Sequence, residues 1–294
     1  MVAGSNPAAV TIFINIFTKK HLFTIYIILV IIIGIGYLFK ILVEPIYIFI
    51  CNKPLVVHFY LFPKKLNDNH KEIISNHFIF YKRLNPKYQK YFDHRVAKLL
   101  ESIQFVSREN IEITFEMKLL IASTSTMLTF GMQKYLYTVL NTIIVYPSSF
   151  YSTVNGDLHI GEFNPKLKIV VFSWEDFYKG IKIDDDNLNL GVHEFSHVLL
   201  FESSQKMKYG TASNYIFSDY YNEIINDLKD PKFLKSLIDS HYFRYYAFVN
   251  SVEFIAVILE QFFETPEQFK ESFPDLFQKV KKMINYNEKY FTLS

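Results

Sequence analysis

The sequence predicts an α+β fold that is mostly helical, carries a small β-sheet and is preceded by an N-terminal transmembrane helix. Three observations lead to this prediction. The segment 22–39 contains no charged residue. Several later segments carry apolar residues at helical spacing, whereas only two short runs have the composition of strands. Half of the 294 residues are hydrophobic, which supplies enough apolar surface for a buried core.

The overall charge and the cysteine content exclude two classes of protein. The formal net charge is only +2, and no basic stripe interleaved with aromatic residues appears, so nucleic acid is not expected as a partner. Cys51 is the single cysteine, which rules out a disulfide within the chain. A chain with one cysteine fits a reducing compartment, which weakly favours a cytoplasmic location.

The N-terminal apolar segment has the length of a membrane-spanning helix. Residues 22–39 are flanked by Lys19, Lys20 and Lys40. About 18 uncharged, apolar residues are sufficient to cross a bilayer as a helix. The segment is longer than the usual core of a signal peptide, and no small-residue cleavage site follows it. Its many β-branched residues leave open a buried core helix or a pair of strands as the alternative.

The chain is predicted to have four parts. We expect an N-terminal tail over 1–21, a membrane-anchoring segment over 22–50, a linker over 51–79 and a folded domain over 80–294. The protein would then be a membrane protein with a single N-terminal anchor. Lysines on the two sides of the anchor nearly balance, so they do not specify its orientation.

Within the folded domain, helices are predicted where apolar residues recur every three or four positions. The predicted helices cover 95–103, 115–128, the region around 193, 219–228, 252–264 and 274–285. The β-rich runs 142–146 and 168–172 predict strands, and Asn-Gly-Asp at 155–157 predicts a turn between them. Asn187 and Asn189 can cap the helix that follows them.

The sequence His-Glu-Phe-Ser-His at 193–197 carries the strongest chemical signal. On a helix, His193 and His197 lie on one face, so both imidazoles can bind one metal ion. Zinc prefers four ligands, and a catalytic zinc site keeps one position for water. Glu194 can then take a proton from that water. The alternative is a core helix with two hydrogen-bonded histidines and a solvated Glu194.

A third protein ligand is predicted in the nearly apolar helix over 252–264. Glu253 lies in its first turn, and because an unpaired buried carboxylate is unfavourable, a zinc ion is a fitting partner. A favourable interaction with the helix dipole is the alternative for Glu253. Glu260 could orient a histidine, or make a structural hydrogen bond or lie at an exposed edge. Tyr246 could donate to a developing oxyanion, although most tyrosines in such positions simply pack.

With these residues in place, the chain resembles the Mlc titration factor A family of zinc-dependent peptidases. The resemblance extends from about residue 80 to residue 287 and follows the family's order. It is carried by the stretches 80–87, 115–122, 144–150, 171–176, 193–197, 250–257 and 262–266. Two departures stand out: Leu200 replaces an Asp that usually follows the zinc motif, and the founding member lacks a membrane segment.

The resemblance implies a zincin-like metallopeptidase domain similar to that of anthrax lethal factor. It implies that His193, His197 and Glu253 bind one Zn²⁺ per chain and that Glu194 is the catalytic base. A Tyr seven residues before the ligand Glu assists catalysis in lethal factor, and Tyr246 has this spacing. The expected activity is hydrolysis of peptide bonds, chiefly aminopeptidase-like, in a peptide or protein substrate, with the domain in the cytoplasm.

Two alternative functions follow from the same residues. The founding member of the family binds a glucose-responsive transcriptional repressor. This chain could therefore be a membrane-anchored protein that binds a transcriptional regulator, with weak or vestigial peptidase activity. A zinc hydrolase that acts on something other than a peptide is the third possibility.

Overall fold

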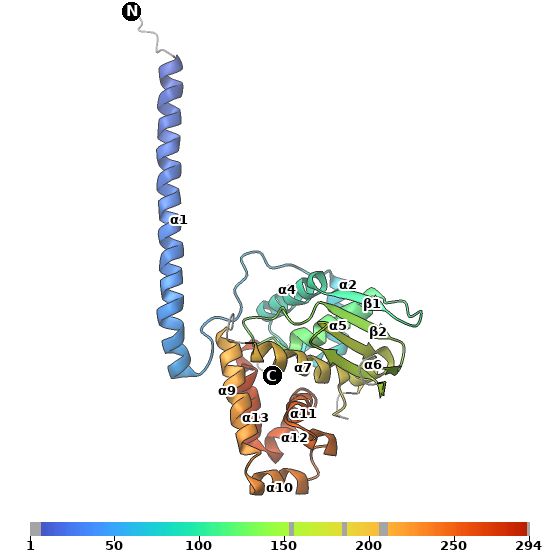
Figure 1. The fold of residues 1–294 in the computed structure, drawn as a ribbon. Helices are drawn as coiled ribbons and strands as arrows, with labels where there is room; N and C mark the ends of the chain where they lie inside the picture. Colours follow the sequence, from blue (N-terminus) through green and yellow to red (C-terminus); the bar gives the residue numbers. More distant parts are fainter. Residues whose placement is uncertain (1–6, 153–155, 184–186, 206–210, 293–294) are drawn as a thin grey trace, which may run out of the picture. The chain divides into compact units, whose positions relative to one another are not determined.

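The computed structural model describes residues 7–152, 156–183, 187–205 and 211–292. It divides the chain into two compact units, Met1–Leu55 and Val56–Ser294. In the described residues, the first unit is built on the helix α1 (Pro7–Cys51), and the second unit contains the remaining helices and strands (Figure 1).

Helix α1 is apolar, and its described side chains are mostly exposed. From Lys19 to Cys51 the helix is long and apolar enough to cross a membrane, and none of this span is buried inside the protein. In the described residues this segment is one helix, so a pair of strands is excluded. A signal sequence near the N-terminus would satisfy the same criteria. At 1.5 Å per residue, these 33 residues extend about 50 Å, more than the ~30 Å of a hydrocarbon core.

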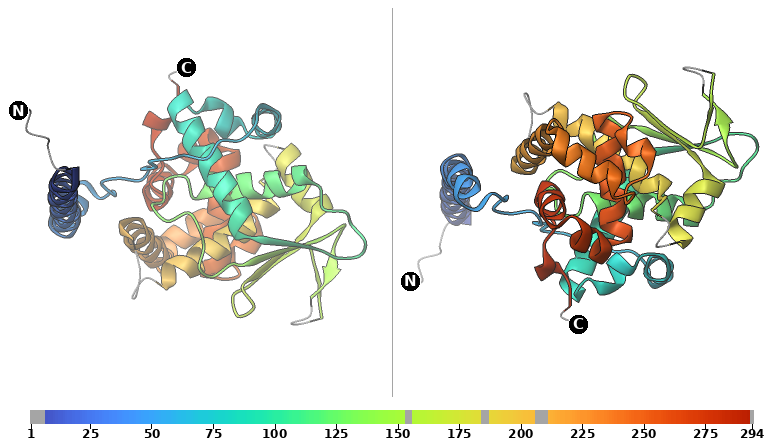
Figure 2. Two further views of the ribbon diagram at one scale, coloured as in Figure 1. Left: turned by 90° about the horizontal axis from the view of Figure 1, so that it is seen from above. Right: turned by 90° about the horizontal axis from the view of Figure 1, so that it is seen from below.

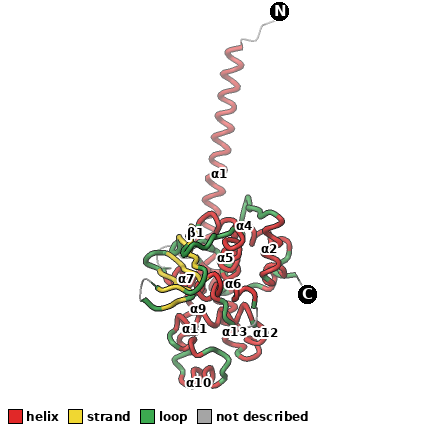
Figure 3. Tube along the Cα trace, turned by 90° about the vertical axis from the view of Figure 1, so that its right-hand side faces the viewer, coloured by secondary structure: helices red, strands yellow, loops and turns green. Residues whose placement is uncertain are grey.

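The second unit is mostly helical, with its strands gathered in one small region (Figure 3). Its longer helices are α4 (Pro86–Ser102), α5 (Phe115–Leu128), α7 (Leu190–Ser204), α9 (Ala212–Asp227) and α11 (Ser251–Glu264). Its shorter helices are α2 (Asp68–His77), α3 (Ile79–Arg83), α6 (Trp174–Lys182), α10 (Pro231–Asp239), α12 (Pro266–Ser272), α13 (Pro274–Met283) and the 3₁₀ turns η1 (Tyr245–Phe248) and η2 (Glu288–Tyr290). This composition confirms the predicted α+β fold.

A four-stranded mixed sheet has the order β1 (Gln104–Ser107), β2 (Thr142–Tyr146), β6 (Ile169–Ser173) and β5 (Gly161–Asn164). The first three strands are parallel, and β5 runs antiparallel to β6 at the edge of the sheet. Buried and half-buried residues alternate along β2, so helices cover one face of the sheet more completely than the other. A separate pair is formed by β3 (Phe150–Tyr151) and β4 (Leu158–His159).

Helix α7 lies at the centre of the second unit. It packs against α5, α6, α9, α11 and the strands β5 and β6, and Figure 2 shows the strands gathered on one side of the helices. Asn189 caps α7, because its side chain accepts a hydrogen bond from the backbone N–H of Val192 at 3.0 Å. Asn187 does not cap the helix: it has a φ of 56° and its backbone oxygen accepts from Arg244.

The predicted elements differ from the observed ones mainly in their bounds. The prediction for α5 and β2 is confirmed residue for residue. The helix predicted over 95–103 is part of α4, which begins at Pro86 after the N-cap Asn85. The strands β1, β3, β4 and β5 were missed, as were the helices α2, α3, α6, α10 and α12, because such short elements contain too few residues to show a clear periodic pattern. In the predicted turn at 155–157, Gly156 has a φ of 77°, and Asn155 lies outside the described residues.

A buried arginine connects the beginning of the second unit to its core. Arg95 of α4 is fully buried and donates hydrogen bonds to the hydroxyl of Tyr60 and to the backbone oxygen of Val57. It also donates to the backbone oxygens of Thr129, Phe130 and Met132, at the C-terminal end of α5 and just beyond it. We call these six residues the Arg95 cluster. It joins part of the segment 51–79 to the folded unit.

Candidate metal centre

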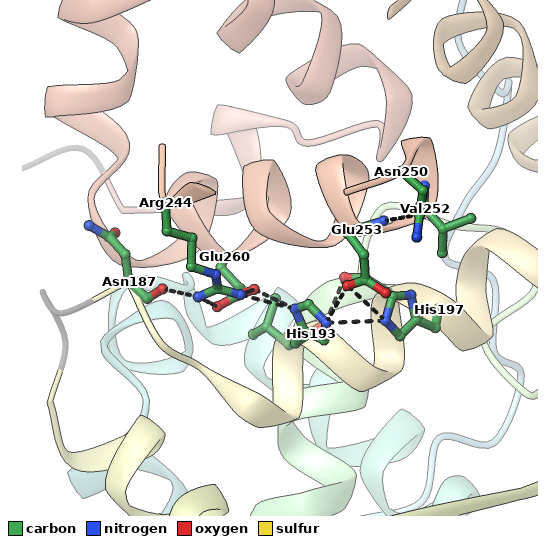
Figure 4. Close-up of polar contacts among 10 residues, drawn as sticks. Asn187, His193, His197, Arg244, Asn250, Val252, Glu253 and Glu260 are labelled. Atoms are coloured by element: carbon green, nitrogen blue, oxygen red, sulfur yellow. Dashed lines mark hydrogen bonds and ion pairs between the residues drawn. The ribbon is translucent and has the colours of Figure 1, made fainter. Parts of the chain in front are cut away.

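Helices α7 and α11 bring together the three side chains that the sequence predicted as metal ligands. His193 Nε2 and His197 Nε2 are 3.1 Å apart. Glu253 Oε2 lies 3.0 Å from His193 Nε2 and 3.6 Å from His197 Nε2 (Figure 4). The three side chains form a group that could hold a metal ion. We call it the His-His-Glu group.

Local structure explains how Glu253 reaches the histidines. The side chain of Asn250 accepts hydrogen bonds from the backbone N–H groups of Val252 and Glu253, which starts α11 at this point (Figure 4). Most of the following residues of α11 are buried, and the helix packs directly on α7. The carboxylate in the first turn of α11 is therefore held next to the imidazoles of α7.

The donor set and its spacing fit a zinc ion. Zinc–ligand bonds of about 2.0–2.2 Å in a tetrahedron separate neighbouring ligand atoms by about 3.3 Å, close to the three observed distances. Glu253 Oε2 is also buried, and it lies 3.0 and 3.6 Å from the two imidazole Nε2 atoms. A cation bound among these three atoms would neutralise the buried carboxylate without requiring a protonated histidine.

A chain of polar contacts holds the ring of His193. Glu260, which is 1 % exposed, places Oε1 2.6 Å from His193 Nδ1. Arg244 binds both oxygens of Glu260, at 2.7 and 3.0 Å, and donates to the backbone oxygen of Asn187 at 2.8 Å. When His193 Nδ1 carries the proton, Nε2 presents its lone pair to the metal position. The contact expected of Glu260 with a histidine is thus present.

The charges of the group are strongly coupled. Burial acts to lower the pKa of His193, but hydrogen bonds with Glu253 and Glu260 outweigh it and raise this pKa to about 10. Burial and the neighbouring His193 lower the pKa of His197 to about 4. Burial raises the pKa of Glu253, yet its contacts with the two histidines leave it below the usual value. A metal ion bound at His193 Nε2 must therefore displace a proton.

Glu194 is buried beside the group and faces strand β5. Its pKa is raised to about 7, chiefly by burial, while the charge of His193 acts in the opposite direction. A Cβ atom at Gly161 would lie 2.6 Å from Glu194 Oε1 and 2.6 Å from Leu190 Cδ1. A glycine at this position of β5 therefore leaves room for the carboxyl group.

Tyr246 lies at the exposed edge of the group. It is part of η1, is 48 % exposed, and its ring centroid is 6.0 Å from that of His193. Burial, followed by the charge of Glu253 and a hydrogen bond to it, raises the pKa of Tyr246 to about 12. Its hydroxyl is therefore protonated at neutral pH, and it acts as a donor to Glu253.

Comparison with known proteins agrees with this geometry. Residues 60–284 match the family described as glucose-regulated metallo-peptidase M90. The chain belongs to this family. The resemblance read from the sequence is thereby confirmed, and the His-His-Glu group lies within the matched region of a metallopeptidase. An uncharacterised protein of Synechocystis sp. is 25 % identical over 241 residues, which cover 76 % of this chain and 85 % of that protein.

Two cavities border the His-His-Glu group in this M90 family member. One cavity, of about 460 Å³, is lined by His193, Glu194 and Tyr246, and by Ile160, which directly precedes β5. Charged residues of α6 also line it, and we call it the polar cavity. The other, of about 610 Å³, is lined by His197 and Glu253, together with mostly apolar side chains; we call it the apolar cavity.

Sequence reasoning missed two residues that shape the centre. Arg244 comes from the segment before η1, and Gly161 comes from the edge strand β5. Neither stands in a pattern with the zinc motif, because each is brought to it only by tertiary packing. An aromatic-rich stretch around Arg244 was visible in the sequence, but it does not indicate an ion pair with Glu260.

Proposed function

We propose that the protein is a zinc-dependent peptidase, anchored by α1 in a membrane, that hydrolyses peptide bonds. The observation that carries the proposal is the convergence of His193, His197 and Glu253 next to a buried Glu194. Membership of a metallopeptidase family supports the same reaction class.

Each side chain has a role in the proposed reaction. His193, His197 and Glu253 hold the zinc ion, and Glu260 and Arg244 orient His193. A zinc ion held there would supply Lewis acidity, which would lower the pKa of a bound water molecule and polarise the scissile carbonyl. Glu194 takes the proton from the attacking water and transfers it to the leaving amine. Tyr246 donates its hydroxyl hydrogen to the oxyanion that develops on the carbonyl.

The edge strand β5 supports a peptide as the substrate. In the described sheet, β5 pairs with β6 on one side only. An extended peptide can add to such an edge through backbone hydrogen bonds, which recognise the main chain whatever the side chains. Gly161 of β5 lies against Glu194, so a peptide on this edge would pass close to the base.

The decisive experiment replaces the proposed base. Glu194→Gln should keep zinc but lose peptide hydrolysis by about 10²- to 10⁴-fold, because a neutral amide cannot accept the proton. The exposed Glu175 supplies the matched control, and Glu175→Gln should behave like wild type. Zinc content and hydrolysis of a peptide mixture are measured together. Unchanged hydrolysis by zinc-loaded Glu194→Gln would refute the mechanism, and full biological rescue by that variant would favour regulator binding.

Membrane anchoring and a cytoplasmic catalytic domain form a separate part of the proposal. Cys51 is exposed, is the single cysteine and lies at the end of α1, so it reports the side on which the second unit emerges. A membrane-impermeant maleimide should label Cys51 only after cells are opened. Labelling of intact cells would place the unit outside, and full recovery of the protein in the soluble fraction would refute the anchor.

A further inference from the structure

We infer that the apolar cavity binds a bulky apolar side chain of the substrate, such as Phe or Leu, adjacent to the scissile bond. The inference rests on the proposed peptidase function and names its substrate class. It begins from the position of the cavity. His197 and Glu253, two members of the His-His-Glu group, form part of its wall.

The two cavities divide the surroundings of the group. The polar cavity is lined by His193, Glu194 and Tyr246, and the apolar cavity shares no lining residue with it. Because the two cavities border different members of the group, we expect the residues on the two sides of the scissile bond to face different cavities and so to meet different chemistry.

The walls of the apolar cavity come from four elements. Strand β5 contributes Phe163, α7 contributes Leu200 and Phe201, α9 contributes Phe217, and α11 contributes Val252. The rings of Phe163 and Phe201 meet edge to face, with centroids 5.9 Å apart. Such walls favour an apolar occupant, which gains by leaving water.

No charged side chain in the described lining could pair with a charged substrate residue, apart from His197 and Glu253 of the metal group itself. The polar cavity, in contrast, is lined by Asp176, Lys179 and Arg244. A charged side chain in the apolar cavity would lose its hydration without gaining a partner, which is unfavourable. The hydroxyl of Ser218 already donates to the backbone oxygen of Ser203, so it does not demand a polar occupant.

The volume permits a large side chain. About 610 Å³ falls within the range of ~300–1,000 Å³ that is usual for ligand sites, and it exceeds what one aromatic side chain needs. An alanine would leave most of this space unfilled by the substrate. Since one methylene in an apolar pocket can change kcat/KM by about 10-fold or more, we expect Phe or Leu to exceed Ala by about 10- to 100-fold.

The test uses the full-length, zinc-loaded protein and a peptide series in which one position at a time on either side of the cleaved bond is Phe, Leu, Ala, Asp or Lys. Asn222 of α9 is exposed and lines the cavity, so Asn222→Trp should fill it. Asn226 lies one turn further along α9, is exposed and does not line the cavity, so Asn226→Trp is the matched control. Hydrolysis is measured with proteins that keep Glu194, and peptide binding is measured with the Glu194→Gln protein.

The expected result is a preference for Phe and Leu at one position only, reduced about 10-fold or more in Asn222→Trp and retained in Asn226→Trp. Hydrolysis without side-chain preference, or a preference that Asn222→Trp leaves intact, would overturn the inference while the peptidase function stands. If no peptide is hydrolysed but Glu194→Gln protein binds Phe peptides selectively and Asn222→Trp abolishes this binding, the cavity assignment stands and the peptidase function fails.

Discussion

Two arginines, the buried Arg95 and the half-buried Arg244, show how differently this molecule uses the same side chain. Arg95 directs five hydrogen bonds at Tyr60 and at four backbone oxygens, so its five N–H donors match five contacts in the Arg95 cluster. Its guanidinium also lies 4.5 Å from the ring centroid of Tyr135. Arg244 instead pairs with the carboxylate of Glu260, which holds an imidazole of the His-His-Glu group.

The difference lies in what remains unsatisfied. Every donor of Arg95 has a partner, and a buried polar group that is fully bonded adds rigidity. In the His-His-Glu group, the Nε2 atoms of His193 and His197 and Glu253 Oε2 converge within 3.0–3.6 Å of one another, an arrangement that only added protons or a bound cation can satisfy. The Arg95 cluster, in contrast, is complete without a ligand. We therefore expect Arg95 to contribute to stability and Arg244 to metal affinity.

The largest expected effect comes from removing Arg95. Arg95→Met should lower the free energy of unfolding by about 3–5 kcal/mol, because several buried carbonyl oxygens lose their donor at once. Urea-induced unfolding measures this free energy. The control variant Arg108→Met, which changes an exposed arginine, should alter it by less than about 0.5 kcal/mol. Equal stability of Arg95→Met and Arg108→Met would remove the stabilising role from the cluster.

Zinc should stabilise the wild-type protein through the His-His-Glu group. At a free zinc concentration about 1,000 times Kd, the gain in unfolding free energy is about 4 kcal/mol. A chelator should remove this gain, and His193→Ala should never show it. Thermal unfolding with zinc and with chelator provides the measurement. Equal stabilisation of His193→Ala by zinc would place the ion elsewhere.

Arg244→Met should weaken zinc binding without a comparable loss of stability. The partner groups behind a metal-bound histidine commonly contribute 10- to 100-fold to metal affinity, and Arg244 holds Glu260 in place. Competition with a chelating dye measures the Kd for zinc. In Arg95→Met the Kd should stay within about 3-fold of wild type, provided the comparison is made on folded protein. A reversed pattern would show that the two arginines have exchanged roles.

The smallest effect concerns the pH dependence of stability near the Arg95 cluster. Burial, with the charges of Arg95 and Lys87, lowers the pKa of His58 to about 2. Below about pH 6.5 the unfolded chain therefore binds a proton that the folded chain does not, and stability is lost as pH falls. The loss is at most ~1.4 kcal/mol per pH unit. His58→Phe should lose less stability than wild type between pH 7 and pH 5.

Asp93 of α4 acts in the opposite direction. Burial raises the pKa of Asp93 to about 6, so its protonation favours the folded state as pH falls between about 4 and 6. Asp93 is present in both wild type and His58→Phe, and its contribution cancels in their difference. If the difference in unfolding free energy between wild type and His58→Phe is the same at pH 7 and pH 5, His58 is excluded as a source of acid sensitivity.

Much of the candidate centre could be predicted from local patterns. His193 and His197 are one helical turn apart, and this spacing alone implies that their rings share a face of α7. Glu253 stands out because a carboxylate in an apolar helix needs a partner. The helix periods likewise predicted α5 and α11 closely, since long amphipathic or apolar stretches leave a clear signal.

Only the tertiary structure decided which distant residues meet the motif. Arg244 and Gly161 have no sequence relation to His193, and they reach it because η1 and β5 pack around α7. The sequence by itself determined the membrane-length apolar helix, the longer helices of the folded domain and the types of the candidate ligands, which depend on composition and short-range periodicity. The partners of those ligands, the two cavities and the five contacts of Arg95 depend on long-range packing, where a side chain's neighbour is set by the fold and not by spacing along the chain.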